Sequence, residues 1–254
     1  MRAVKGALSG DPLVRFEILR RLAGWILPQY RFKWPQMEWW NDRAFNAVLE
    51  RFGESRGMNT DRLWMVAQLM RLVADVPGAT AECGVYRGAG SYSICSMNER
   101  NPLHRRAHFV FDSFEGLSTP AAADGDQWKR GDMACPLDEV KRNLSGFGGV
   151  QLLKGWIPER FAEAEGQRFA FAHIDVDLYQ PTLDSMMFFY PRMNDGGIIL
   201  CDDYGFTSCP GATRAVDEVL RDKPEKMVAL SCGGGFLIKG CRTAGTLGAG
   251  EPGK

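Results

Sequence analysis

Carboxylates stand directly after two apolar runs of this 254-residue chain. Asp175 ends one run, and Asp202 and Asp203 end the next. Asp175 and Asp202 are 27 residues apart, about the length of one helix and one strand, so we expect them at the ends of neighbouring strands. Since parallel strands end at the same edge of a sheet, the pattern predicts that these carboxylates converge.

Converging carboxylates repel one another unless a cation lies between them, and Mg²⁺ is the usual partner of oxygen ligands. Such a metal would bind a substrate hydroxyl and lower the pKa of that hydroxyl, and a nearby carboxylate would accept the proton. The alternative is that the aspartates cap the following helices and bind nothing. Asp177 follows Asp175 by two residues, which also gives the Asp-x-Asp form that holds a metal and a sugar diphosphate.

A glycine-rich turn lies at residues 82–90, after the first predicted strand. Gly84 and Gly88 allow the backbone to turn tightly and to approach a ligand. Their spacing departs from the dinucleotide fingerprint, and Glu82 stands where a carboxylate would repel a pyrophosphate. A cationic ligand such as S-adenosylmethionine fits better; the alternative is an ordinary glycine-rich turn.

Three further positions carry possible binding groups. Asp112 ends a strand-like run, where its carboxylate could accept hydrogen bonds from ribose hydroxyls or could cap a helix. Gly155-Trp156 follows another strand, where the indole could stack on an adenine or belong to the core. His173 could serve as a base or orient a ligand, but a histidine at a strand end is as often structural.

Short apolar runs alternate with helical stretches from residue 79 onward, which predicts an α/β fold with a mostly parallel, doubly wound sheet. Gly233-Gly234-Gly235 joins the last two of seven strands closely, so the last strand is expected to be antiparallel. Strands are predicted near residues 79–83, 107–112, 150–154, 169–174, 197–201, 226–231 and 235–239. Helices are predicted at about 89–99, 137–145, 157–164, 179–193 and 211–221.

The segments around this core differ in composition. Residues 1–57 are interpreted as a helical and aromatic extension, with a helix that ends at Pro28 and five aromatic residues between 30 and 40. That arm could cover the core, a partner subunit or a membrane surface. A further helix near 42–52 precedes one that begins at Thr60, the expected N-cap. The long polar stretch 119–134 is predicted to be a lid, with a solvated insertion as the alternative, and 243–254 a flexible tail.

Composition narrows the function classes. The 31 basic and 31 acidic residues cancel, which disfavours a nucleic-acid binder. The seven cysteines include no Cys-x-x-Cys pair and are typical of a reducing compartment. We see neither a signal peptide nor an apolar stretch that could span a membrane, so a cytoplasmic protein is expected.

These motifs together resemble the macrocin O-methyltransferase (TylF-type) family, which includes the mycinamicin enzyme. The matching stretches lie at residues 82–90, 111–116, 154–156, 173–179 and 202–205, in the family's order. The resemblance spans roughly residues 58–240. It implies a class I methyltransferase fold (58–242) that uses S-adenosylmethionine and Mg²⁺ to methylate a sugar hydroxyl, typically on a natural product.

The resemblance also implies roles for individual residues. Asp175, Asp202 and Asp203 would be the metal ligands, with Asp175 also the general base, and Asp177 is less certain. Other positions would bind the cofactor: Thr60, Glu82, Gly84, Tyr86, Arg87, Asp112, Ser113, Gly155 and Trp156. The first 55 residues and the lid look individual to this chain and would choose the acceptor, expected to be a hydroxylated small molecule such as a glycoside.

Rival interpretations remain at this point. Asp175-Val176-Asp177 is compatible with a metal-dependent glycosyltransferase, although Glu82 and the second carboxylate pair disfavour it. A non-catalytic interaction module has no physical need to retain carboxylates that repel. A nicotinamide oxidoreductase is disfavoured by the glycine spacing. The aromatic arm suggests a homo-oligomer, but it could equally cover its own core.

Overall fold

The computed structural model describes residues 12–27, 37–54 and 59–244, and the chain divides into two compact units, Met1–Arg51 and Phe52–Lys254. The smaller unit contains the predicted N-terminal helix, α2 (Pro12–Ile26), where Glu17 pairs with Arg20 and Arg21. The short helix η1 (Glu38–Asn41) precedes α3 (Arg43–Phe52). Residues 28–36 of the predicted aromatic arm and the tail from 245 onward lie outside the described residues.

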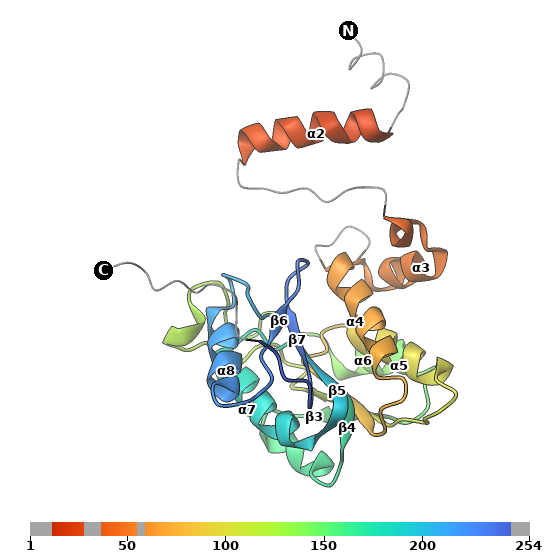
Figure 1. The fold of residues 1–254 in the computed structure, drawn as a ribbon, viewed down its shortest axis with the longest axis vertical. Coiled ribbons are helices and arrows are strands. Elements are labelled where there is room, and N and C mark those ends of the chain that lie inside the picture. Colours follow the sequence, from red (N-terminus) through yellow and green to blue (C-terminus); the bar gives the residue numbers. More distant parts are fainter. Residues whose placement is uncertain (1–11, 28–36, 55–58, 245–254) are drawn as a thin grey trace. The chain divides into compact units, whose positions relative to one another are not determined.

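The larger unit is built on a seven-stranded sheet with the order β3-β2-β1-β4-β5-β7-β6 (Figure 1). Strands β1 to β5 run parallel, whereas β7 pairs antiparallel with both β5 and β6. This confirms the predicted class I methyltransferase architecture. The strands are β1 (Ala79–Cys83), β2 (His108–Asp112), β3 (Val150–Lys154), β4 (Phe169–Ile174), β5 (Met193–Cys201), β6 (Val228–Ala229) and β7 (Gly235–Ile238).

Helices cover both faces of this sheet (Figure 1). Leu69 of α4 and Ile94 of α5 pack with Phe171 on one face, whereas Met186 of α7 and Val216 of α8 pack in the cluster on the other. The helices are α4 (Thr60–Leu72), α5 (Ala89–Arg100), α6 (Leu137–Leu144), α7 (Tyr179–Phe189) and α8 (Pro210–Leu220), with short 3-10 turns η3 (Ala122–Asp124), η4 (Glu159–Ala164) and η5 (Tyr190–Arg192).

The central strands are fully buried because helices exclude water from both faces, which explains why their sequences read as continuous apolar runs. Phe111 of β2 packs edge-on against Phe161 and Phe189, with ring centroids 5.0 and 6.1 Å apart. Phe111 directly precedes Asp112, one of the predicted cofactor positions.

Several predicted boundaries are wrong. The helix expected at 179–193 ends at Phe189, because Pro191 has no N–H to continue the helical hydrogen bonds. Strand β5 already begins at Met193, four residues before the expected start, and its pairing with β4 is irregular near Gly196, whose φ is +81°. The segment 157–164 forms a 3-10 helix rather than an α-helix, and β6 is shorter than predicted.

The N-terminus of α4 also differs from the expectation. Asn59, rather than Thr60, occupies the N-cap position, and Thr60 is the first helical residue. The Thr60 hydroxyl donates to the Glu54 carbonyl over 3.3 Å instead of capping α4. The Asn59 side-chain oxygen accepts a 2.7 Å hydrogen bond from the Arg62 side chain and does not accept one from the backbone of α4.

Candidate active site

The predicted site residues gather where β1, β2, β4 and β5 end, at the edge of the sheet where open α/β folds bind their ligands. Two cavities open there. The first is lined by most of the predicted cofactor positions together with one predicted metal ligand: Gly84, Tyr86, Asp112, Ser113, Gly155, Trp156 and Asp175. Its remaining lining includes Phe111 and Leu178, so the wall is largely apolar with a few polar groups, as in nucleoside pockets.

The turn after β1 depends on glycine. Gly84 has a φ of +76°, and a Cβ at this position would collide with the backbone carbonyl of Asp175. The Asp175 N–H in turn donates to the carbonyl of Cys83 over 2.9 Å. The close approach of the two strand ends therefore places Asp175 beside the glycine-rich turn, and only glycine leaves room for it.

Asp112 ends β2 with its carboxylate tied to two loops. One oxygen accepts from the Val85 N–H over 2.7 Å, and the other accepts from the Phe114 N–H over 2.5 Å. Burial raises the pKa of Asp112 above its usual value, although these backbone donors act in the opposite direction. The adjacent Ser113 hydroxyl donates to the Gly116 carbonyl over 2.8 Å, so both polar side chains are held at the cavity wall.

The second cavity adjoins the first and is more polar. Its lining includes Arg62 of α4 and Asn59, the N-cap residue of that helix. The other polar residues of its wall are Glu82, Arg87, His173 and Asp202. Tyr86, Met133 and Asp175 line both cavities. A molecule in each cavity would therefore meet at Asp175.

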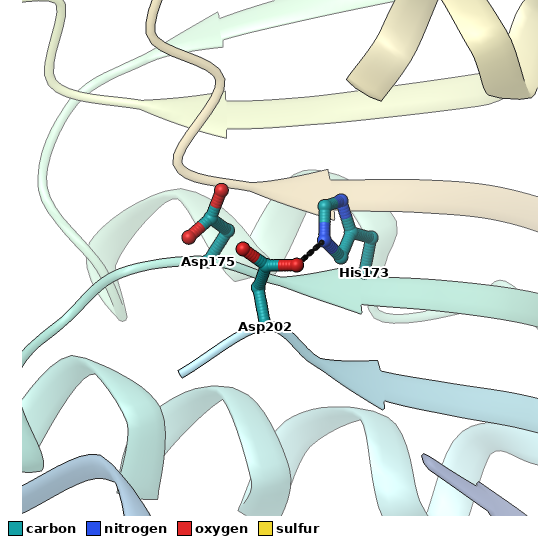
Figure 2. A group of neighbouring side chains, drawn as sticks. All are labelled: His173, Asp175 and Asp202. Atoms are coloured by element: carbon teal, nitrogen blue, oxygen red, sulfur yellow. Dashed lines mark ion pairs between the residues drawn. The ribbon is translucent and has the colours of Figure 1, made fainter. Parts of the chain in front are cut away.

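His173 lies between two carboxylates, those of Glu82 and Asp202. Figure 2 shows its ion pair with Asp202. Its Nδ1 is 2.8 Å from the Glu82 carboxylate, and its Nε2 is 3.5 Å from Asp202. Burial lowers the pKa of His173, but the two carboxylates outweigh burial and hold the pKa well above the ordinary value. The Glu82 carboxylate also accepts a hydrogen bond from the Ser91 hydroxyl, and Glu82 is 2% exposed.

The pKa values of two predicted metal ligands, Asp175 and Asp202, are shifted in opposite directions. Burial, reinforced by Asp202 and Asp203, raises the pKa of Asp175 well above its usual value. Burial acts the same way on Asp202, but His173 and Arg62 lower the pKa of Asp202 below the usual value. Asp202 therefore holds its negative charge more readily than Asp175 does. Asp175 has the raised pKa expected of a group that accepts a proton.

The similarity of the chain to known proteins agrees with this geometry. Residues 55–226, well over half of the chain, match the family model described as Macrocin-O-methyltransferase (TylF). The chain belongs to this family. This match confirms the resemblance seen in the motifs.

Curated relatives of this TylF-family chain are enzymes of natural-product assembly. The chain is 32% identical over 153 residues to the 8-demethyl-8-(2,3-dimethoxy-alpha-L-rhamnosyl)-tetracenomycin-C 4'-O-methyltransferase of Streptomyces olivaceus, which covers 56% of this chain and 58% of the relative. It is 31% identical over 149 residues to the mycinamicin III 3''-O-methyltransferase of Micromonospora griseorubida, covering 53% and 58%. The similarity thus spans less than two thirds of the relatives' length.

Solved structures share the fold. The O-methyltransferase NovP aligns with a TM-score of 0.61 and 26% identity over 71% of this chain and 80% of NovP. The calicheamicin methyltransferase CalS11 aligns with a TM-score of 0.62 and 22% identity over 85% of this chain and 97% of CalS11. Within the part of the chain that the structure describes, no helix is long and apolar enough to cross a membrane.

The TylF-family site contains an arginine that the motifs did not indicate. Arg62, on α4, forms an ion pair with Asp202 and donates to the Asp202 backbone carbonyl over 3.2 Å. A charged residue next to the apolar position Leu63 on a partly buried helix was the available signal. The partner could not be read from the sequence, because Arg62 and Asp202 are 140 residues apart.

The third predicted metal ligand, Asp203, lies in a neighbouring group. Its carboxylate accepts a 2.8 Å hydrogen bond from the Asp177 N–H, and Asp177, Asp203 and Cys209 form one cluster whose possible ligand atoms lie within 4.8 Å of one another. Asp175 and Asp202 form a separate cluster with His173 under the same distance limit. Burial raises the pKa of Asp177 to about 6.

The predicted lid contributes to the wall of the site. Met133, near its end, lines both cavities. Asp124 and Trp128 form hydrogen bonds to residues outside the segment. The Asp124 carboxylate accepts from the Tyr179 N–H over 2.6 Å, at the start of α7. The Trp128 indole N–H donates to the Cys209 sulfur over 3.3 Å.

Proposed function

We propose that this chain is an S-adenosylmethionine-dependent O-methyltransferase that methylates a hydroxyl of a sugar or glycosylated natural product with the help of a divalent cation. One observation carries the proposal: Asp175 lines both cavities. A methyl donor in the first cavity and an acceptor in the second would meet beside a buried carboxylate of raised pKa. Membership of the macrocin O-methyltransferase family supports the same reaction.

The first cavity is assigned to the methyl donor. Gly84 gives close backbone access, Asp112 and Ser113 offer oxygens to ribose hydroxyls, and Trp156 offers a flat apolar ring for an adenine. Tyr86 and Gly155 complete the same wall. The cofactor roles expected of Thr60, Glu82 and Arg87 stay predictions: Glu82 and Arg87 line the second cavity, and Thr60 bonds to a neighbouring loop.

The donor set at the meeting point suits a divalent cation. Asp175, Asp177, Asp202 and Asp203 stand close enough to raise or lower one another's pKa, and Arg62 and His173 provide the compensating charge. Carboxylate oxygens are ligands of Mg²⁺. Asp175 and Asp202 are the ligands that the geometry supports, and the role of Asp203 stays a prediction. A bound cation would act as a Lewis acid toward the acceptor hydroxyl.

The residues of the chain then perform two tasks. Asp175 accepts the proton of the acceptor hydroxyl while the hydroxyl oxygen attacks the methyl carbon, in line with the departing sulfur. A carbon–oxygen bond forms and the carbon–sulfur bond breaks, which yields the methyl ether and S-adenosylhomocysteine. The walls of the two cavities hold the reactants in line, and such positioning supplies roughly 7–11 kcal/mol in favourable cases.

The acceptor class follows from the relatives. The tetracenomycin and mycinamicin enzymes are named for methylation of glycosylated compounds, and CalS11 is described as a TDP-rhamnose 3'-O-methyltransferase. We infer a glycoside or nucleotide sugar as acceptor. No observation favours the glycosyltransferase alternative. The lid at 119–134, the domain bounds 1–57 and 58–242, the homo-oligomer, the lack of nucleic-acid binding and the cytoplasmic location stay predictions.

Calorimetric titration with S-adenosylhomocysteine tests the methyl-donor assignment. We expect micromolar binding, weakened about tenfold by Trp156→Ala, because stacking of a base on an aromatic ring contributes about 1–3 kcal/mol. Trp25→Ala is the matched control, since Trp25 is 83% exposed on α2 and should leave binding unchanged. Binding of uridine diphosphate glucose in place of S-adenosylhomocysteine would overturn the proposal. If S-adenosylhomocysteine binds, assays of methyl transfer to TDP-rhamnose and to mycinamicin III would identify the acceptor class.

A further inference from the structure

A row of buried polar side chains crosses the interior between the sheet and α5. Thr80 and Glu82 lie two residues apart on β1, so both point to the same face of the sheet. His108 is the neighbour of Thr80 on β2. Ser91 and Asn98 lie seven residues apart, about two turns of α5, and share one side of that helix. Each of the five residues is at most 9% exposed, and apolar side chains would cost less to bury.

Hydrogen bonds join these five side chains end to end. The Asn98 amide donates to the Thr80 hydroxyl over 2.8 Å, and that hydroxyl lies 2.9 Å from Nδ1 of His108. Nε2 of His108 lies 2.9 Å from the Ser91 hydroxyl, which donates to the Glu82 carboxylate. The hydrogen-bonded chain therefore runs from α5 through both strands to a residue that lines the second cavity.

The carboxylate at one end fixes the direction of every bond in this chain. A carboxylate only accepts, so the Ser91 proton points at Glu82, and the Ser91 oxygen accepts from Nε2–H of His108. Burial lowers the pKa of His108 to about 3, so the imidazole is neutral and its Nδ1 has no proton. Nδ1 then accepts from the Thr80 hydroxyl, whose oxygen accepts from Asn98. All the bonds point toward Glu82.

Bonds that point one way hold the final acceptor firmly, because each donor is polarised by the donor behind it. The chain ends at one oxygen of Glu82, and the other oxygen lies 2.8 Å from Nδ1 of His173. Gly90 lies close to this carboxylate, and a Cβ there would collide with it. Glu82 is therefore held in one orientation, and its oxygens keep lone pairs for a ligand in the cavity that it lines.

We propose that Ser91 and His108 are positioning residues that hold the Glu82 carboxylate in place to bind the ammonium group of the methyl donor. The proposal rests on the proposed function and deepens it, because it assigns the amino-acid end of S-adenosylmethionine. The two cavities adjoin at Tyr86 and Asp175, so a donor whose adenosine fills the first cavity would reach Glu82 across this boundary. His108 lines neither cavity and acts only through Ser91 and Glu82.

A purely structural network predicts a different result. It would stabilise the packing of α5 on β1 and β2 and would affect every ligand of the site equally. Positioning of Glu82 affects only ligands that carry an ammonium group. S-adenosylhomocysteine has this group, whereas 5'-methylthioadenosine keeps the adenosine and the sulfur but lacks the amino-acid part. The ratio of the two dissociation constants therefore separates the two roles.

Calorimetric titration with both ligands measures that ratio. His108→Leu should weaken S-adenosylhomocysteine binding about 10-fold and leave 5'-methylthioadenosine binding unchanged, and Glu82→Gln should have the same effect. His108→Gln should restore part of the loss, because its side-chain amide can donate to Ser91 in place of Nε2. Ser91→Ala breaks the same chain and serves if His108→Leu does not fold. His104→Gln, at a position that lines neither cavity, is the matched control and should change neither constant.

Nitrogen NMR of protein labelled with ¹⁵N-histidine tests the direction of the chain. We expect a protonated Nε2 and an unprotonated Nδ1 at His108. The chain has three histidines, and the spectra of His104→Gln and His108→Gln assign their signals. The opposite tautomer, with the proton on Nδ1, would direct the bonds away from Glu82 and overturn the proposal. The tautomer is measured on the unmutated protein, where no substitution disturbs the fold.

The outcomes separate this proposal from the proposed function. Equal weakening of both ligands in His108→Leu, or no weakening of either, would overturn the positioning role and leave the methyl-donor assignment standing. Unchanged S-adenosylhomocysteine binding in Glu82→Gln would likewise overturn it. Failure of the unmutated protein to bind either ligand would overturn the proposed function, and this proposal with it.

Discussion

Asp175 lies where the cavity proposed for the methyl donor meets the cavity proposed for the acceptor. It lines both cavities, its pKa is raised by burial and by Asp202, and the backbone of the glycine-rich turn contacts it through Gly84. No other predicted carboxylate of the site lines both cavities. The chemical role of the residue thus follows from its place between the two ligands.

Asp175→Asn should lower the rate of methyl transfer by about 100-fold or more, since the amide cannot accept the hydroxyl proton. The Kd for S-adenosylhomocysteine should change little, because the amide is nearly isosteric with the carboxyl group it replaces. Radiolabelled transfer to an accepted glycoside measures the first quantity and calorimetry the second. Asp184→Asn, at a half-buried position of α7 that lines neither cavity, is the control. Near-native turnover in Asp175→Asn would exclude Asp175 as the base.

At the scale of elements, the predicted lid provides the cap of a core helix. The N-cap residue of α7 is Leu178, which has no side-chain oxygen, and the buried Asp124 accepts the Tyr179 N–H instead. Because α7 packs on α8 and on β4, the conformation of residues 119–134 is coupled to the helix that begins beside Asp175.

Asp124→Ala should therefore destabilise the protein by about 1–2 kcal/mol, the usual cost of losing a helix cap, and Asp124→Asn by less. Urea unfolding measures the free energy, and hydrogen exchange at the Tyr179 amide reports the local effect. Asp126→Ala, on the same segment but exposed, should change stability little. Equal losses in the two alanine variants would show that Asp124 does not cap α7.

For the whole molecule, the segment after α8 is joined to the core by a buried carboxylate. Glu225 is 1% exposed and accepts hydrogen bonds from the Tyr190 hydroxyl, the Gly240 N–H and Lys239. Burial would raise the pKa of Glu225, but these donors outweigh burial and lower the pKa from 4.5 to about 2. A depressed carboxyl pKa stabilises the fold above pH 4.5 and loses that effect as the pH falls toward 2.

Glu225→Gln should accordingly be less stable than the wild type by about 2–3 kcal/mol at pH 7, and the difference should shrink by about half at pH 3. Urea unfolding at both pH values measures it. Glu163→Gln, which removes an exposed ion pair with Arg160, should change the free energy of unfolding by less than about 1 kcal/mol. A difference for Glu225→Gln that is independent of pH would contradict the assigned pKa.

The strands and the edge at which the site lies could be predicted from the sequence by itself. Apolar runs that end in Glu82, Asp112, Asp175 and Asp202 suffice, because a doubly wound sheet brings the carboxyl ends of its parallel strands to one edge. The family followed from the same motifs, and the family comparison confirms it. Helix ends were predicted less accurately. The helix expected at 179–193 ends at Phe189, because Pro191 interrupts it.

Only the tertiary structure decided which side chains pair. Glu82 and His173 are 91 residues apart, and Arg62 and Asp202 are 140 apart, so no local pattern records either contact. The grouping of Asp203 with Asp177 rather than with Asp175 depends in the same way on side-chain rotamers and on a backbone hydrogen bond. Strand order follows from local periodicity and chain connection, whereas the partner of a buried charge depends on packing across the whole sheet.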